Sequence, residues 1–204
     1  MNIPNLDYEE QLFGNIAGID EAGRGPLVGP VVAAAVIIDK SNIIDGINDS
    51  KKLSANQRQT IYDKIITSYP YSIGIASVKE IDELNILRAT KLAMKRALAQ
   101  LPLQPDHILV DGNIKLETNI PIQSIIGGDR ISISIAAASI IAKVHRDQLI
   151  IKLHDEFPQY NWQKNKGYGT KEHLAAITQH GISKYHRRTF SPAKDMISKY
   201  KINE

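Results

Sequence analysis

The chain has 204 residues, with 25 basic and 22 acidic side chains, 43% hydrophobic residues and no cysteine. This is an ordinary globular composition, and the lack of cysteine excludes a disulfide scaffold, a zinc–cysteine site, an iron–sulfur cluster and a cysteine nucleophile. Any metal ion must therefore have oxygen or imidazole ligands. We expect one domain over residues 1–204, with no membrane span, no signal peptide and a cytoplasmic location.

The first part of the chain predicts three strands and two helices. Residues 15–20, 31–38 and 71–78 have the apolar and β-branched composition of strands. Ser54 and Gln57 have the spacing of a capping box, which predicts that a helix begins there. Leucines at roughly helical spacing over residues 81–101 predict a long helix that Pro102 ends.

The second part predicts two more strands and two more helices. Residues 107–111 and 122–126 are typical of short strands, while residues 131–157 and 170–180 are typical of helices. Strands in a meander followed by strands after crossover helices predict an α/β fold, with a mixed five-stranded sheet flanked by helices. We expect a catalytic core over about residues 15–155 and a helical, basic C-terminal extension over about residues 156–204.

Acidic residues follow three of the predicted strands. Asp20 and Glu21 end the first strand, Asp111 ends the strand at residues 107–111, and Asp129 follows the last strand. A crossover helix normally joins parallel neighbours, whose carboxyl ends share one sheet edge, so we expect Asp20 and Asp111 to lie close together.

Two interpretations of these acids remain open at this point. Clustered carboxylates need a compensating cation, and two divalent ions bound by oxygen would supply it and support phosphodiester hydrolysis. The structural alternative is that Asp111 and Gly112 form a turn and that Asp129 caps a helix.

Several segments have features of a polyanion-binding surface. They are the turn of Gly23, Arg24 and Gly25, the loop with Lys51 and Lys52, the helical pair Lys143 and Arg146, and the stretch 164–171 with Tyr168. Residues 1–139 hold 13 basic and 16 acidic side chains, a net charge of −3, whereas residues 140–204 hold 12 and 6, a net charge of +6. Taken singly, each segment is more typical of a tight turn or a solvated surface.

Together these segments resemble bacterial ribonuclease HII, of the type 2 ribonuclease H family. The similarity extends in order through residues 18–36, 49–54, 109–113, 127–147, 165–173 and 186–190. It implies a ribonuclease H-like fold with a C-terminal helical extension. It also implies an endoribonuclease that uses two Mn²⁺ or Mg²⁺ ions when substrate is bound.

The substrates implied by the resemblance are RNA–DNA hybrids and duplex DNA with single embedded ribonucleotides. Cleavage on the 5′ side of the ribonucleotide would leave a 3′-hydroxyl and a 5′-phosphate, as part of ribonucleotide removal in DNA repair and replication.

The resemblance also assigns roles to residues. Asp20, Glu21, Asp111 and Asp129 would be the catalytic metal ligands. Gly23, Arg24 and Gly25 would read the ribose 2′-hydroxyl, Tyr168 would pack on the following deoxyribose, and Lys51, Lys52 and Arg24 would contact phosphates. Gly127 departs from the family, which often has lysine there, and we expect a weaker phosphate contact as a result.

Three rival functions remain at the level of sequence. One is a type 3 ribonuclease H, although that family usually has an extra N-terminal domain and a different glycine turn. The others are a hybrid-binding module without activity and a general DNA nuclease. We expect a monomer, and a sliding clamp is a candidate partner although residues 198–201 carry no clear motif for one. We interpret His145 and Asp147 as structural rather than metal-binding.

Overall fold

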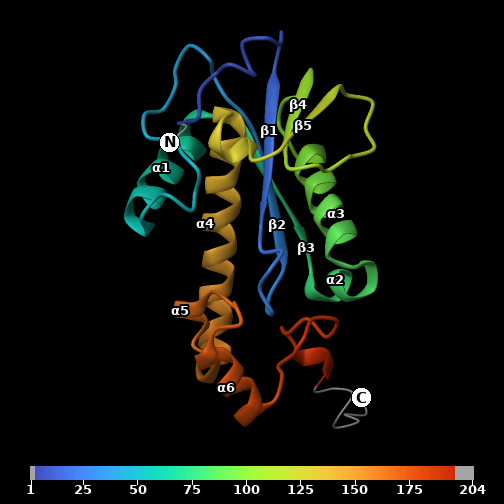
Figure 1. Ribbon diagram of the computed structural model, residues 1–204. Helices are drawn as coiled ribbons and strands as arrows, with labels where there is room; N and C mark the ends of the chain where they lie inside the picture. The colour runs from blue at the N-terminus through green and yellow to red at the C-terminus, as the bar shows by residue number, and fades with distance from the viewer. Residues whose placement is uncertain (1–2, 196–204) are drawn as a thin grey trace.

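The computed structural model describes residues 3–195, which form a five-stranded sheet with helices on both faces (Figure 1). Strands β1 (Ile16–Ala22), β2 (Val31–Ile37) and β3 (Tyr71–Ala76) form an antiparallel meander, and β4 (His107–Asp111) and β5 (Ile122–Ile125) run parallel to β1. The strand order is β3-β2-β1-β4-β5. This arrangement confirms the predicted mixed sheet, and it places the ends of β1 and β4 side by side.

Each face of the sheet has its own apolar core. Helices α1 (Ala55–Ser68) and α4 (Ile133–Glu156) pack on one face, while α2 (Val78–Leu84) and α3 (Ile86–Ala99) lie on the other (Figure 1). In β2, successive side chains alternate between these cores: Ala34 belongs to the α1 and α4 side, and Ala33 to the α3 side. Burial on both faces explains why β2 is apolar throughout its length.

The C-terminal extension packs against the end of α4. It contains the 3₁₀ turn η2 (Pro158–Tyr160), α5 (Trp162–Asn165) and α6 (Lys171–His180). Its core is aromatic, and the rings of Tyr160 and Trp162 stack with centroids 5.0 Å apart. Leu27 and Val28, from the loop between β1 and β2, belong to the same core. The extension therefore packs against the loop that follows the acidic end of β1.

The structure corrects one predicted helix. The region expected as one helix over residues 81–101 is two helices, α2 and α3, separated by Asn85. Asn85 has φ +68°, and its side-chain oxygen accepts hydrogen bonds from the N–H groups of Leu87 and Arg88. Ser77 and Glu80 form a capping box at the start of α2. The predicted capping box at Ser54 is confirmed.

No helix in the described part of the chain has the length and apolar character needed to cross a membrane.

Candidate functional site

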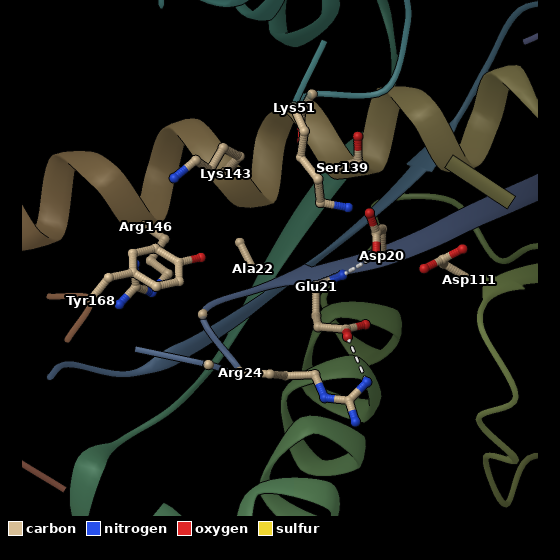
Figure 2. Close-up of a pocket in the computed structure, with 13 residues that line it drawn as sticks. Asp20, Glu21, Ala22, Arg24, Lys51, Asp111, Ser139, Lys143, Arg146 and Tyr168 are labelled. Atoms are coloured by element: carbon tan, nitrogen blue, oxygen red, sulfur yellow. Dashed lines mark hydrogen bonds and ion pairs between the residues drawn. The ribbon is translucent and has the colours of Figure 1, made fainter. Parts of the chain in front are cut away.

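The acidic residues lie together at one edge of the sheet. Ile19 of β1 is paired with Val110 of the parallel strand β4, so the next residues, Asp20 and Asp111, are neighbours (Figure 2). Asp129 lies in the 3₁₀ turn η1 (Gly128–Arg130), which follows β5. Asp20 and Asp129 are only 5% and 4% exposed. Four acidic residues, from β1, β4 and η1, therefore converge in a largely buried position.

Burial and mutual repulsion disfavour the charged form of these acids. Desolvation, followed by the charges of Glu21 and Asp111, raises the pKa of Asp20 well above its ordinary value. Desolvation also raises the pKa of Glu21, although Arg24 opposes this, and desolvation with the Asp129 charge raises the pKa of Asp111. A cation placed among these carboxylates would relieve both effects.

The donor set fits a divalent cation chemically. Glu21 Oε2 and Asp111 Oδ1 are buried and have no hydrogen-bond partner, and such oxygens are the ligands that Mg²⁺ and Mn²⁺ prefer. Over residues 3–195, however, no group of three or more His, Cys, Asp or Glu side chains is already arranged to hold a metal ion. Neighbouring residues of a strand point to opposite faces, so Asp20 and Glu21 approach the edge from different sides.

A lysine lies next to the acidic cluster. Lys51 Nζ is 3.0 Å from Asp129 Oδ2, and its pKa is raised because the bond to Asp129 and the charges of nearby acids outweigh desolvation. The lysine is oriented by a local turn, in which the Lys51 N–H donates to the buried carboxylate of Asp49 over 2.9 Å. Lys51 thus supplies one positive charge beside the acids.

Two buried arginines hold the glycine turn after β1. Arg187 Nε and Nη1 donate to the carbonyls of Gly29 and Arg24, and its Nη2 donates to Gly23. Arg146 donates to the carbonyls of Val28 and Lys166, over 3.0 and 3.1 Å. Burial and the nearby charge of Arg146 lower the pKa of Arg187 to about 9, so it stays cationic at neutral pH. Both arginines therefore hold the main chain of this turn and its neighbouring loops in place.

This finding corrects the suggestion that Lys143 and Arg146 form a polyanion-binding pair. Both side chains line the cleft, but Arg146 is 1% exposed and bonded to main chain, whereas Lys143 pairs with Asp147 over 2.8 Å. The pair with Lys143 also gives Asp147 a structural role, as expected. Ser139, which the sequence reasoning missed, lines the same cleft. Ser139 lies four residues before Lys143, so both side chains are on one face of the helix. This spacing is the feature of the sequence that could have predicted Ser139 as a lining residue.

The two glycines of the turn have different structural requirements. Gly23 has φ +99°, and a Cβ there would lie 2.1 Å from Arg146 Nε, so the turn requires glycine. At Gly25 a Cβ would meet nothing nearer than Tyr168 Cε1 at 3.8 Å. Between them, Arg24 Nη1 is 3.2 Å from Glu21 Oε1 (Figure 2). Gly25 and Tyr168 thus lie next to each other in the lining of the cleft.

Tyr168 is positioned by a chain of buried histidines. His173 Nδ1 lies 2.8 Å from the Tyr168 carbonyl oxygen, and His173 Nε2 accepts from Trp162 Nε1 over 3.0 Å. His186 Nε2 is 3.2 Å from His173 Nε2, while His186 Nδ1 accepts from the Ser183 N–H. In one tautomer assignment His186 carries its proton on Nε2 and His173 on Nδ1, so His173 Nδ1 donates to Tyr168 and the single lone pair of His173 Nε2 is shared by two donors. Desolvation and the His173 charge lower the pKa of His186 to about 3, which keeps it neutral.

These residues surround one cleft of about 390 Å³ (Figure 2). Its lining includes most of the expected site residues: Asp20, Glu21, Gly23, Arg24, Gly25, Lys51, Asp111 and Tyr168. Asp129 is not among the lining residues, but it contacts Lys51, which is. Lys52 is not among the lining residues.

Gly127 shows why a lysine is not accommodated there without adjustment. It has φ +66°, and a Cβ would lie 2.2 Å from Arg130 Nη2. The Arg130 side chain therefore occupies the space beside Gly127, and its Nε lies 3.9 Å from Asp129 Oδ1.

Comparison with known proteins places this site in a family. The family model described as Ribonuclease HII matches residues 17–193. The Ribonuclease HII of Wolbachia pipientis subsp. Culex pipiens is 58% identical over 195 residues, which cover 95% of this chain and 99% of that protein. The ribonuclease H2 structure from Pyrococcus horikoshii has a TM-score of 0.79 at 29% identity, covering 93% of this chain and all of that one.

A type 3 enzyme shares the fold more distantly. Bst-RNase HIII in complex with Mn²⁺ has a TM-score of 0.72 at 18% identity, and the match covers 93% of this chain but 71% of that one.

Proposed function

Because the chain belongs to the ribonuclease HII family and is thus a ribonuclease H, we propose that it cuts on the 5′ side of single ribonucleotides embedded in duplex DNA. RNA–DNA hybrids are its second substrate, and the cut leaves a 3′-hydroxyl and a 5′-phosphate. The observation that carries this proposal is the juxtaposition of unpaired carboxylate oxygens at Glu21 and Asp111 with the glycine turn and Tyr168 in one cleft. We place the activity in the removal of ribonucleotides from DNA.

The acidic cluster is the proposed catalytic centre. Asp20, Glu21, Asp111 and Asp129 would hold two Mn²⁺ or Mg²⁺ ions when substrate is bound. Such ions, when bound, supply a reactive water and stabilise charge on a departing oxygen. The raised pKa values of Asp20, Glu21 and Asp111 support this role, because carboxylates whose charged forms remain disfavoured gain most from an added cation.

The opposite side of the cleft is the proposed recognition surface. The exposed backbone of the turn at Gly23, Arg24 and Gly25 would hydrogen-bond the 2′-hydroxyl, the group that distinguishes RNA from DNA. Tyr168, which is 46% exposed and faces Gly25, would pack on the following deoxyribose. Lys51 would contact a phosphate beside Asp129. Lys52 would act farther from the reaction, since it does not line the cleft.

The decisive test is cleavage of an end-labelled DNA duplex with one internal ribonucleotide, with Mn²⁺, with Mg²⁺ and with EDTA. We expect one product that ends at the deoxynucleotide before the ribonucleotide, formed only with a divalent ion. Equal cleavage in EDTA would contradict the metal assignment. A 2′,3′-cyclic phosphate at the product end would contradict the whole proposed reaction.

Two control substrates separate this proposal from its rivals. An all-DNA duplex of the same sequence should stay intact, and its cleavage would indicate a general nuclease. Binding of the ribonucleotide-containing duplex without any cut in Mn²⁺ would indicate a binding module. The candidate clamp contact at residues 198–201 lies outside the described residues and carries no proposal.

A further inference from the structure

A second cleft, of about 230 Å³, lies between α3 and the segment that follows β4. It is lined by four basic side chains, one acidic and one apolar: Arg88, Lys91, Lys95, Lys115, Glu117 and Leu92. Nothing in the proposed catalytic site uses this cleft. Its lining makes it a candidate for binding a negatively charged ligand.

The cleft holds an excess of positive charge. Its one carboxylate, Glu117, is 2.9 Å from Lys95 Nζ, and this hydrogen bond is the main reason that the pKa of Glu117 is lowered. Arg88, Lys91 and Lys115 form no ion pair with any other residue in the described range 3–195. The charge of Lys91 also acts on Glu117, but no ion pair joins the two, so three cationic groups of this described region face the cleft outside any ion pair.

The positions of these cations match a nucleic-acid backbone. Arg88, Lys91 and Lys95 are three and four residues apart on α3, and the rise from the first to the last is about 10 Å. This length equals the rise of about three nucleotides in one strand of a duplex. On the other wall, Ile114 and Leu116 are 4% and 7% exposed and pack into the core with α3. The intervening Lys115 is thus held at a fixed place on the surface.

The cleft is also close to the catalytic edge. Lys115 follows Asp111 by four residues, so their α-carbons are separated by at most about 14 Å, or roughly four base-pair steps. In Figure 2 the helix drawn in green, α3, lies on the side of β1 toward which the side chains of Glu21 and Arg24 extend. A duplex bound at the carboxylates would extend into this region.

We propose that this basic cleft binds the phosphate backbone of the same duplex, beyond the position of the cut. The inference rests on the proposed function, which brings the duplex to the edge at Asp111. A nucleic-acid backbone fits better than an acidic peptide because the duplex at Asp111 already lies beside the cleft, and Leu92 is the single apolar side chain in the lining that could anchor a peptide. The basic cleft would then extend the contact between protein and duplex to about four base pairs from the cut.

The test is the double substitution Lys91→Gln with Lys115→Gln, matched to the double substitution Lys64→Gln with Lys152→Gln. Binding of a duplex with one ribonucleotide is measured in EDTA at several salt concentrations, so that the result does not depend on cleavage. Two lost phosphate contacts should weaken binding roughly tenfold and make the slope of log K against log salt shallower by about 1.8. The control pair should leave both quantities unchanged.

Duplex length gives a second readout. Three duplexes are compared. One extends 15 base pairs on both sides of the ribonucleotide, and the other two are each shortened to three base pairs, one on the 5′ side and one on the 3′ side. Binding of the duplex that lacks the side reaching the cleft should be insensitive to the Lys91 and Lys115 substitutions. Equal salt slopes for the unmodified protein and this variant on the longest duplex would overturn the proposal. Failure of the unmodified protein to cleave would instead count against the proposed function.

Discussion

Asp20 has opposite effects on activity and on stability. It is buried beside Glu21 and Asp111, and its charged form is disfavoured in the folded chain. The substitution Asp20→Asn should lower turnover at least about 100-fold, because a metal ligand supplies several kcal/mol of transition-state stabilisation. In EDTA, above the folded-state pKa of Asp20, the substitution should raise the unfolding free energy, since one buried and repelled charge is removed. Cleavage rates measure the expected loss of turnover, and denaturant unfolding of the same preparation measures the expected gain in stability. Undiminished turnover would show that Asp20 is not part of the catalytic site.

The same carboxylate predicts a pH dependence of stability. Its pKa in the folded chain is raised well above the ordinary value of 3.8, so between these two pKa values the folded state binds more protons than the unfolded state. The Asp20 contribution therefore lowers stability as pH rises through this window, and the loss is complete above the folded-state pKa. Melting temperatures in EDTA from about pH 4 to neutral should fall more steeply for the unmodified protein than for Asp20→Asn. Parallel curves would contradict the prediction.

Gly23 and Gly25 form a matched pair for testing the turn. Gly23→Ala places a methyl group against Arg146 at a positive φ, and should cost about 1–3 kcal/mol of stability. Gly25→Ala has neither problem and should leave stability within about 0.5 kcal/mol, yet its methyl group would project toward Tyr168. We expect Gly25→Ala to reduce kcat/KM for a single ribonucleotide in a fully folded protein. Normal kinetics for Gly25→Ala would exclude this turn from sugar recognition.

At the scale of the elements, α6 is linked to recognition through His173. The side-chain nitrogen of asparagine can take the place of histidine Nδ1, which donates to the Tyr168 carbonyl, whereas that of glutamine takes the place of Nε2. His173→Asn should therefore retain more kcat/KM on a single-ribonucleotide duplex than His173→Gln, although both lose stability, by about 1–3 kcal/mol.

A double-mutant cycle distinguishes positioning from general destabilisation. If His173 acts through Tyr168, the difference between the two His173 variants should vanish in a Tyr168→Ala background. A difference that persists there would mean that His173 affects activity by another route.

Some of these elements could be predicted from the sequence, and others could not. The strands and the convergence of Asp20 with Asp111 were predictable, because apolar runs and crossover connections determine which strand ends meet. The break at Asn85 was missed, since leucine spacing continues across it and the capping function of Asn85 depends on its local conformation. The burial of Arg146 and Arg187 was also not predictable, because their partners are backbone carbonyls from a distant turn. Sequence composition does not show which basic side chains bind main chain.

The burial of Arg146 and Arg187 changes what the charge distribution of the whole chain means. The net charge of +6 over residues 140–204 suggested a basic surface. In the structure, Arg146 and Arg187 are buried, Lys143 pairs with Asp147, and Lys184 pairs with Glu156 over 3.1 Å. Much of the positive charge therefore serves the internal assembly of the extension and the glycine turn. The surface available to a polyanion is smaller than the formal charge indicates.

The salt dependence of substrate binding measures that available surface directly. The catalytic cleft offers Arg24 and Lys51, and the basic cleft on α3 adds Arg88, Lys91 and Lys115. Each phosphate contact contributes about −0.9 to the slope of log K against log salt, so five contacts predict a slope of roughly −4 to −5. A slope nearer to −10 would mean that the C-terminal extension uses its full charge on the duplex. A flat response would mean that binding depends on the sugar and the carboxylate centre alone, because phosphate contacts necessarily release counterions.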